Sequence, residues 1–108
     1  MTQVLHNRYV IRQELGQGGM GEVFLAEDTT LPGRLVALKV NTVADAATQR
    51  QFQREALLLA RLHHPNLPRV SDYFRATDGR QFLVMDYIRG ENLQQQIGKH
   101  TSELQSLV

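Results

Sequence analysis

The feature that most constrains this chain is a run of glycines near its amino terminus. Four of the six residues from Gly16 to Gly21 are glycine. Glycine has no Cβ and loses much conformational entropy on folding, so such a run interrupts regular structure. Residues 9–15 (YVIRQEL) and 22–27 (EVFLAE) on either side alternate as strands do. The sequence therefore predicts a hairpin with the glycines at its tip.

The rest of the chain predicts three more strands and one long helix. Residues 29–33 (TTLPG) are typical of a turn, and residues 35–40 (LVALKV) of a third strand. From about Asp45 to Leu62 apolar residues fall on one helical face, and Asp45 suits the amino-terminal cap. The segments VSDYF and QFLVMDYI then flank a turn at residues 77–80. We expect an α+β fold, a five-stranded antiparallel sheet with one major helix between the third and fourth strands.

Composition excludes several classes of protein. The 108 residues have room for one modest domain, and a net charge of +1 gives no field that would attract nucleic acid or an anionic membrane. The chain has no cysteine, which excludes disulfides and thiolate metal sites. It has no signal peptide and no apolar run long enough to cross a bilayer, so we expect a cytoplasmic location. A membrane segment beyond residue 108 of a longer parent stays open.

The glycine run also fits the pattern G-x-G-x-x-G-x-V over residues 16–23 (GQGGMGEV). Glycines let backbone N–H groups approach phosphates without a Cβ in the way, so a phosphate-binding loop is one interpretation. A flexible hairpin that only needs positive φ angles is another. A dinucleotide-binding fold is disfavoured, because it requires a helix directly after the glycines and an acidic residue about 20 positions further on. Here a predicted strand follows the glycines, and the position about 20 residues further on falls in VALKV, whose one polar residue is a lysine and not an acid.

Lys39 and Glu55 form a second candidate site. Ala37 and Lys39 share one face of the predicted third strand, with Val36, Leu38 and Val40 on the other. The alternative is an edge strand with Lys39 in water. Glu55 lies on the helical stripe expected to face the core, where an unpaired carboxylate would cost several kcal/mol; the alternative is a boundary position. We expect Glu55 to position Lys39, whose ammonium then meets nucleotide phosphates.

Four segments in this order and spacing resemble the amino-terminal half of protein kinases. They are LGQGGMGEVFLAED, VALKV, REALLLARLHHPNLPRV and FLVMDYIRGENL, and GGMGEVF resembles the bacterial (Hanks-type) serine/threonine kinases. The resemblance covers the chain from about Tyr9 to its end. It implies a tail at residues 1–8, the kinase amino-terminal lobe with its glycine loop and hinge at 9–90, and the beginning of the helical carboxyl-terminal lobe at 91–108. The sheet and helix of that lobe agree with the elements predicted above.

The resemblance implies a role for each candidate residue. The glycine loop would cover the phosphates of ATP, Lys39 would contact the α- and β-phosphates, and Glu55 would hold Lys39. Leu15, Val23 and Ala37 would form an apolar roof over adenine. Met85 would lie behind the adenine, and the backbone of Asp86 and Ile88 would offer hydrogen bonds to its edge. The implied nucleotide-binding set is the loop Gly16, Gln17, Gly18, Gly19, Met20, Gly21 and Glu22, the roof Leu15, Val23 and Ala37, then Lys39, Met85, Asp86 and Ile88.

The resemblance also shows what the chain lacks. Kinases carry their catalytic carboxylate and magnesium ligands in H-R-D-x-x-x-x-N and D-F-G, and neither motif occurs in the 108 residues. We therefore expect no phosphoryl transfer by this chain alone, and Mg²⁺ and a protein substrate only for a full-length parent. His63 and His64 lack the further ligands of a metal site, so no metal is expected.

Two hypotheses for the function follow. In the first, the chain is a fragment of an active serine/threonine kinase, which its end inside a predicted helix favours. In the second, it is a stand-alone nucleotide-binding or regulatory module, similar to a pseudokinase. A lone lobe would expose the apolar surface that meets the other lobe, so we also expect self-association.

Overall fold

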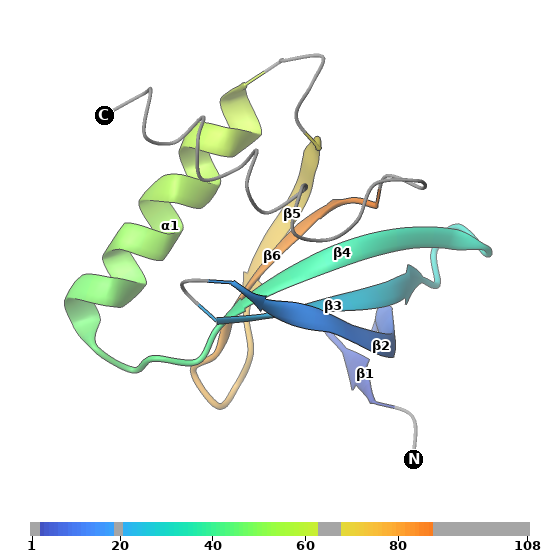
Figure 1. Ribbon diagram of the computed structural model, residues 1–108, viewed down its shortest axis with the longest axis horizontal. Helices are drawn as coiled ribbons and strands as arrows, with labels where there is room; N and C mark the ends of the chain where they lie inside the picture. The colour runs from blue at the N-terminus through green and yellow to red at the C-terminus, as the bar shows by residue number, and fades with distance from the viewer. Residues whose placement is uncertain (1–2, 19–20, 63–67, 88–108) are drawn as a thin grey trace.

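The computed structural model describes residues 3–18, 21–62 and 68–87 of the chain. Its elements are β1 (Val4–Leu5), β2 (Tyr9–Gly18), β3 (Gly21–Asp28), β4 (Arg34–Asn41), α1 (Ala46–Arg61), β5 (Val70–Arg75) and β6 (Gln81–Asp86). The strands pair antiparallel in one sheet of order β1-β2-β3-β4-β6-β5, with α1 on one side (Figure 1). The predicted α+β fold is confirmed. The described part has six strands rather than five, because β1 lies in the segment expected to be a tail.

Three turns connect the strands for identifiable local reasons. His6 and Asn7 both have positive φ angles, 56° and 51°, in a tight turn closed by the Arg8 N–H donating to the Leu5 carbonyl at 3.0 Å. This backbone geometry matches the twist of a two-stranded ribbon, and asparagine tolerates it better than most residues. The predicted turns at Gly33 and Gly79 are confirmed, with φ angles of 85° and 94° that suit glycine.

Helix α1 follows the sequence pattern closely. The side chain of Asp45 accepts hydrogen bonds from the Thr48 N–H and hydroxyl, both at 3.0 Å, which confirms the predicted cap. Phe52, Ala56 and Leu59 are buried, and their spacings of four and three place them on one face of the helix. Packing of this face against the sheet determines where every other residue of the helix points.

The sheet separates two hydrophobic clusters. The first comprises Leu5, Tyr9, Ala26, Val36, Leu38, Val40, Phe74, Phe82 and Val84. It takes residues from both edge strands, β1 and β5, so the sheet curls around it. The second lies between the sheet and α1 and comprises Val23, Ala37, Phe52, Ala56, Leu59, Leu83 and Met85. Alternate residues of β4 thus enter different clusters, as the period of two in VALKV predicted.

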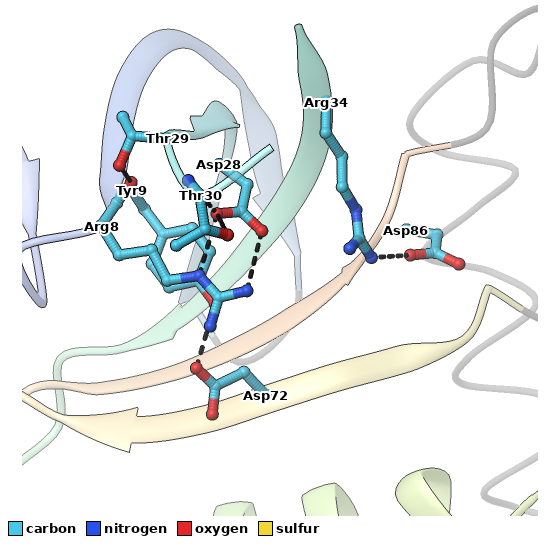
Figure 2. Close-up of polar contacts among 8 residues, drawn as sticks. All are labelled: Arg8, Tyr9, Asp28, Thr29, Thr30, Arg34, Asp72 and Asp86. Carbon is cyan, nitrogen blue, oxygen red and sulfur yellow. Dashed lines mark hydrogen bonds and ion pairs between the residues drawn. The ribbon is translucent and has the colours of Figure 1, made fainter. Parts of the chain in front are cut away.

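Polar contacts connect the start of β2 to edge strand β5 and to the end of β3 (Figure 2). The Tyr9 hydroxyl donates to Asp72 at 3.0 Å, and burial together with this bond raises the pKa of Tyr9 to about 12. The Arg8 guanidinium donates two hydrogen bonds of 2.9 Å to Asp28, which is 1% exposed. These bonds, with others from Thr30, hold the pKa of Asp28 well below its usual range. The network fixes the β1–β2 turn against the end of β3.

We predict that Asp28→Asn destabilises the fold at neutral pH by about 2 kcal/mol, since it leaves half-exposed Arg8 facing a neutral amide. The folded pKa of Asp28 is depressed, so its stabilisation is full at neutral pH and is lost as pH falls below about 4. Urea denaturation of both proteins at pH 7 and in acid measures this. The difference in free energy of unfolding between the two proteins should shrink in acid. As a control, Glu14→Gln at an exposed position should change the free energy of unfolding by less than about 0.5 kcal/mol. A difference that does not depend on pH would contradict the assignment.

Candidate functional site

The central feature of the candidate site is a lysine in the middle of the sheet. Lys39 lies on β4 and pairs in register with Val23 of β3 and Leu83 of β6. The residue is only 7% exposed. Since β4 is an internal strand, the alternative of an edge strand with Lys39 in water is wrong. Ala37 enters the cluster under α1, which agrees with the prediction that Ala37 and Lys39 share a face.

The electrostatics of Lys39 combine two opposing influences. Burial lowers the pKa of its ammonium, because an apolar environment disfavours the charged form. The negative charge of Glu55 on α1 acts in the opposite direction and raises it. Glu55 is half-buried and accepts a long hydrogen bond of 3.4 Å from Gln51, and no ion pair between described residues joins it to Lys39. The structure thus brings Glu55 within electrostatic range of Lys39 but not into an ion pair.

The glycines lie at the tip of the β2–β3 hairpin, as predicted. Gly16 pairs with Val23, Gln17 with Glu22, and Gly18 with Gly21 at the end of the ladder. A register shift between Glu14 and Gly16 interrupts the regular pairing just before the tip. The predicted loop residues Gly19 and Met20 lie outside the described residues. The hairpin shares β3 with the β3–β4 pair that places Val23 beside Lys39.

Three of the residues assigned to the adenine site lie close together. Val23, Ala37 and Met85 belong to the cluster under α1 and are 1%, 0% and 4% exposed. Ala37 is the register partner of Met85, which makes them neighbours on one face. Leu15, also assigned to this roof, is half-buried and lies outside that cluster.

The assigned hinge begins at Asp86. Its backbone N–H donates to the Arg69 carbonyl at 2.9 Å, so the backbone of Asp86 has its carbonyl oxygen left to accept a hydrogen bond from a ligand. The carboxylate of Asp86 forms an ion pair with Arg34 at 3.0 Å, which joins the start of β4 to the end of β6 (Figure 2). Ile88, the other predicted hinge contact, lies outside the described residues.

Sequence reasoning missed a buried glutamine that positions the helix. Gln81 is fully buried; its amide donates to the Tyr73 hydroxyl at 2.7 Å and to the Gln49 carbonyl at 3.0 Å. Its carbonyl oxygen accepts from Asn41 at 2.8 Å. These bonds connect β4, β5 and β6 to the start of α1, the helix that carries Glu55. A polar residue opening the apolar run QFLVMD was the only sequence signal for it.

A second residue that was missed is Leu83, the register partner of Lys39. Leu83 is 2% exposed and forms part of the apolar surroundings of the ammonium. Its position could have been inferred, because Leu83 and Met85 are two residues apart on one strand and therefore share a face.

Comparisons with known proteins agree with this geometry. Residues 9–106 match the family model described as "Protein kinase domain". The chain is 40% identical over 101 residues to a probable serine/threonine-protein kinase, PknB, of Lactococcus lactis, covering 91% of this chain and 16% of that protein. It is 41% identical over 91 residues to the serine/threonine-protein kinase pkn3 of Myxococcus xanthus, covering 82% of this chain and 16% of that protein.

A solved structure shares the fold as well as the sequence. The kinase domain of Mycobacterium tuberculosis PknI, crystallised as a double mutant, superposes with a TM-score of 0.63 at 37% identity. The match covers 82% of this chain and 36% of that chain. The chain thus spans about a sixth of the length of the two curated relatives and about a third of the PknI kinase domain.

We predict that Glu55→Gln lowers the pKa of Lys39 further, because the mutation removes the charge that opposes the effect of burial. The chain has only two lysines, Lys39 and Lys99, so a pH titration of the lysine Cε carbons by NMR gives two signals. Glu14→Gln, an exposed substitution on β2, should leave the Lys39 titration unchanged. An unchanged pKa of Lys39 in Glu55→Gln would show that Glu55 does not act on the lysine.

Proposed function

Since this chain belongs to the protein kinase family, we propose that residues 9–90 are the ATP-binding lobe of a serine/threonine protein kinase. The observation that carries the proposal is Lys39, an ammonium in the apolar middle of the sheet without an ion pair among the described residues. A buried cation is costly unless an anion compensates it, and such groups concentrate at functional sites. The phosphates of ATP supply that anion.

In the proposed complex each element has one task. Backbone N–H groups of the glycine hairpin lie over the phosphates, where glycine permits close approach. Lys39 neutralises charge on the α- and β-phosphates as a point charge, and Glu55 keeps its ammonium charged and oriented. Val23, Ala37 and Met85 provide the apolar surface for the adenine ring. Gln81 supports the arrangement indirectly, because it fixes the start of the helix that bears Glu55.

Transfer of the γ-phosphate to a protein hydroxyl is proposed for a longer parent protein. The relatives are named as serine/threonine kinases, and their remaining length lies outside this match. The 108 residues contain no H-R-D or D-F-G motif, so we expect this chain alone to be inactive. Within residues 3–18, 21–62 and 68–87, no three acidic or histidine side chains gather to hold a metal. We propose that Mg²⁺ accompanies ATP only in the longer parent, whose further motifs would supply its ligands.

Three further properties are proposed for this protein. They are a cytoplasmic location, a protein substrate for the parent, and self-association of the isolated lobe. None of the helices in the described ranges is long and apolar enough to cross a membrane. No feature of the described residues favours a stand-alone regulatory module over the lobe of an active kinase.

We predict that Lys39→Met weakens ATP binding at least about tenfold, equivalent to roughly 1.4 kcal/mol. The loss should be confined to the phosphates, so affinity for adenosine should change less than about twofold. Isothermal titration calorimetry with both ligands measures this. Methionine in an apolar setting should not destabilise the sheet, which a thermal melt checks.

The matched control is Lys99→Met, which removes the other lysine of the chain and should leave ATP affinity unchanged. If Lys39→Met bound ATP as tightly as the unmodified chain, the proposed role of Lys39 at the phosphates would be refuted.

A further inference from the structure

The outward face of α1 carries a stripe of arginines. Arg50, Arg54, Leu57 and Arg61 stand at i, i+4, i+7 and i+11, which places them one above another on a helix, and all four are exposed. Leu57 is 55% exposed, and its neighbour Leu58 is 37% exposed. The stripe extends about 16 Å along the helix axis at 1.5 Å per residue. It lies on the side opposite Phe52 and Leu59, which face the sheet.

Four of the six described arginines outside α1 form ion pairs, whereas in the stripe only Arg50 has a nearby negative charge, that of the Asp45 cap. Those pairs are Arg8 with Asp28, Arg12 with Glu27, Arg34 with Asp86, and Arg80 with Asp78, while exposed Arg69 and Arg75 have no ion pair with a described residue. No arginine of the stripe forms an ion pair with a described residue. The one acidic residue within α1, Glu55, is on the side toward Lys39.

The stability of the helix does not account for the stripe. Arg50 and Arg54 are like charges at i, i+4, which destabilises a helix by a few tenths of a kcal/mol. The Asp45 cap offsets the positive end of the helix dipole, and its carboxylate also interacts electrostatically with Arg50, whereas Arg54 has no such compensation. Only Arg61, in the last turn, interacts favourably with the dipole. The face therefore concentrates positive charge and apolar surface at a cost to the isolated fold.

We propose that this arginine stripe, Arg50, Arg54, Leu57, Leu58 and Arg61, is a docking surface for an acidic amphipathic helix of a partner protein. Three guanidiniums over about 16 Å match carboxylates at the same helical spacings, and the two leucines provide an apolar anchor between them. A membrane is a poorer occupant, because an interfacial helix needs a broad apolar face and this one offers two leucines among arginines. The surface is separate from the proposed nucleotide site and independent of it.

The test uses the full chain and a labelled synthetic helical peptide. The peptide carries glutamates spaced to match Arg50, Arg54 and Arg61, with two leucines between the second and third glutamates. Fluorescence anisotropy at low ionic strength should give saturable binding that weakens with added salt. The double variant Arg54→Glu, Arg61→Glu should weaken binding at least about tenfold, and Leu57→Ala should weaken it several-fold.

The matched control is Arg69→Glu, Arg75→Glu, which makes the same charge change at two exposed residues at the ends of β5. It should alter affinity less than about twofold. The proposal is overturned by the absence of saturable binding, by equal loss in both double variants, or by tighter binding to phosphatidylglycerol vesicles than to the peptide. All substituted side chains are exposed, so far-UV circular dichroism should show unchanged folding.

Discussion

Burial of one ammonium group is the constraint on which the rest of this structure depends. Lys39 occupies an internal strand between Val23 and Leu83, where transfer of a charge from water is expensive. Methionine at this position would fill similar space at a lower electrostatic cost. A buried lysine ammonium needs negative charge nearby to offset the cost of its desolvation. In the described fold Glu55 supplies part of that charge. Nucleotide phosphates would supply the remainder.

The position of Glu55 depends on contacts far from it. Phe52, Ala56 and Leu59 pack α1 on the sheet, and Gln81 hydrogen-bonds the helix start to three strands. Because both sets of contacts come from residues close to Lys39 in the sheet, helix and lysine form one packed unit. A shift of α1 would change the distance between the two charges. The energy of the charge pair is thus coupled to the packing of the second hydrophobic cluster.

Much of the fold could be predicted from local patterns. The period of two in VALKV gave the correct face for Lys39, the helical period gave α1, and the glycine positions gave the hairpin tip and two turns. Contacts between distant residues could not be predicted in this way. Tyr9 and Asp72 are 63 residues apart on strands that are not neighbours, so only the curl of the sheet brings them together. Arg8 and Asp28 are 20 residues apart and meet because the β2–β3 register pairs Tyr9 with Asp28.

The candidate site was predictable to a similar extent. Val23, Ala37 and Met85 come together as expected, whereas Leu83 and Gln81 were missed because their roles arise from strand register and from burial of an amide. The pairing of Lys39 with Glu55 was inferred from the cost of an inward carboxylate. In the structure Glu55 is only half-buried and acts on Lys39 through its charge, without an ion pair between them.

The most direct measurement is the pKa of Lys39, followed by NMR of its Cε carbon, in the free chain, with saturating adenosine and with saturating ATP. Phosphate charge next to the ammonium must favour its protonated form. The account predicts that ATP raises the pKa of Lys39 and that adenosine leaves it unchanged or lowers it by further burial. An identical pKa in the free and ATP-saturated chains would show that the phosphates do not approach Lys39 and would contradict the account.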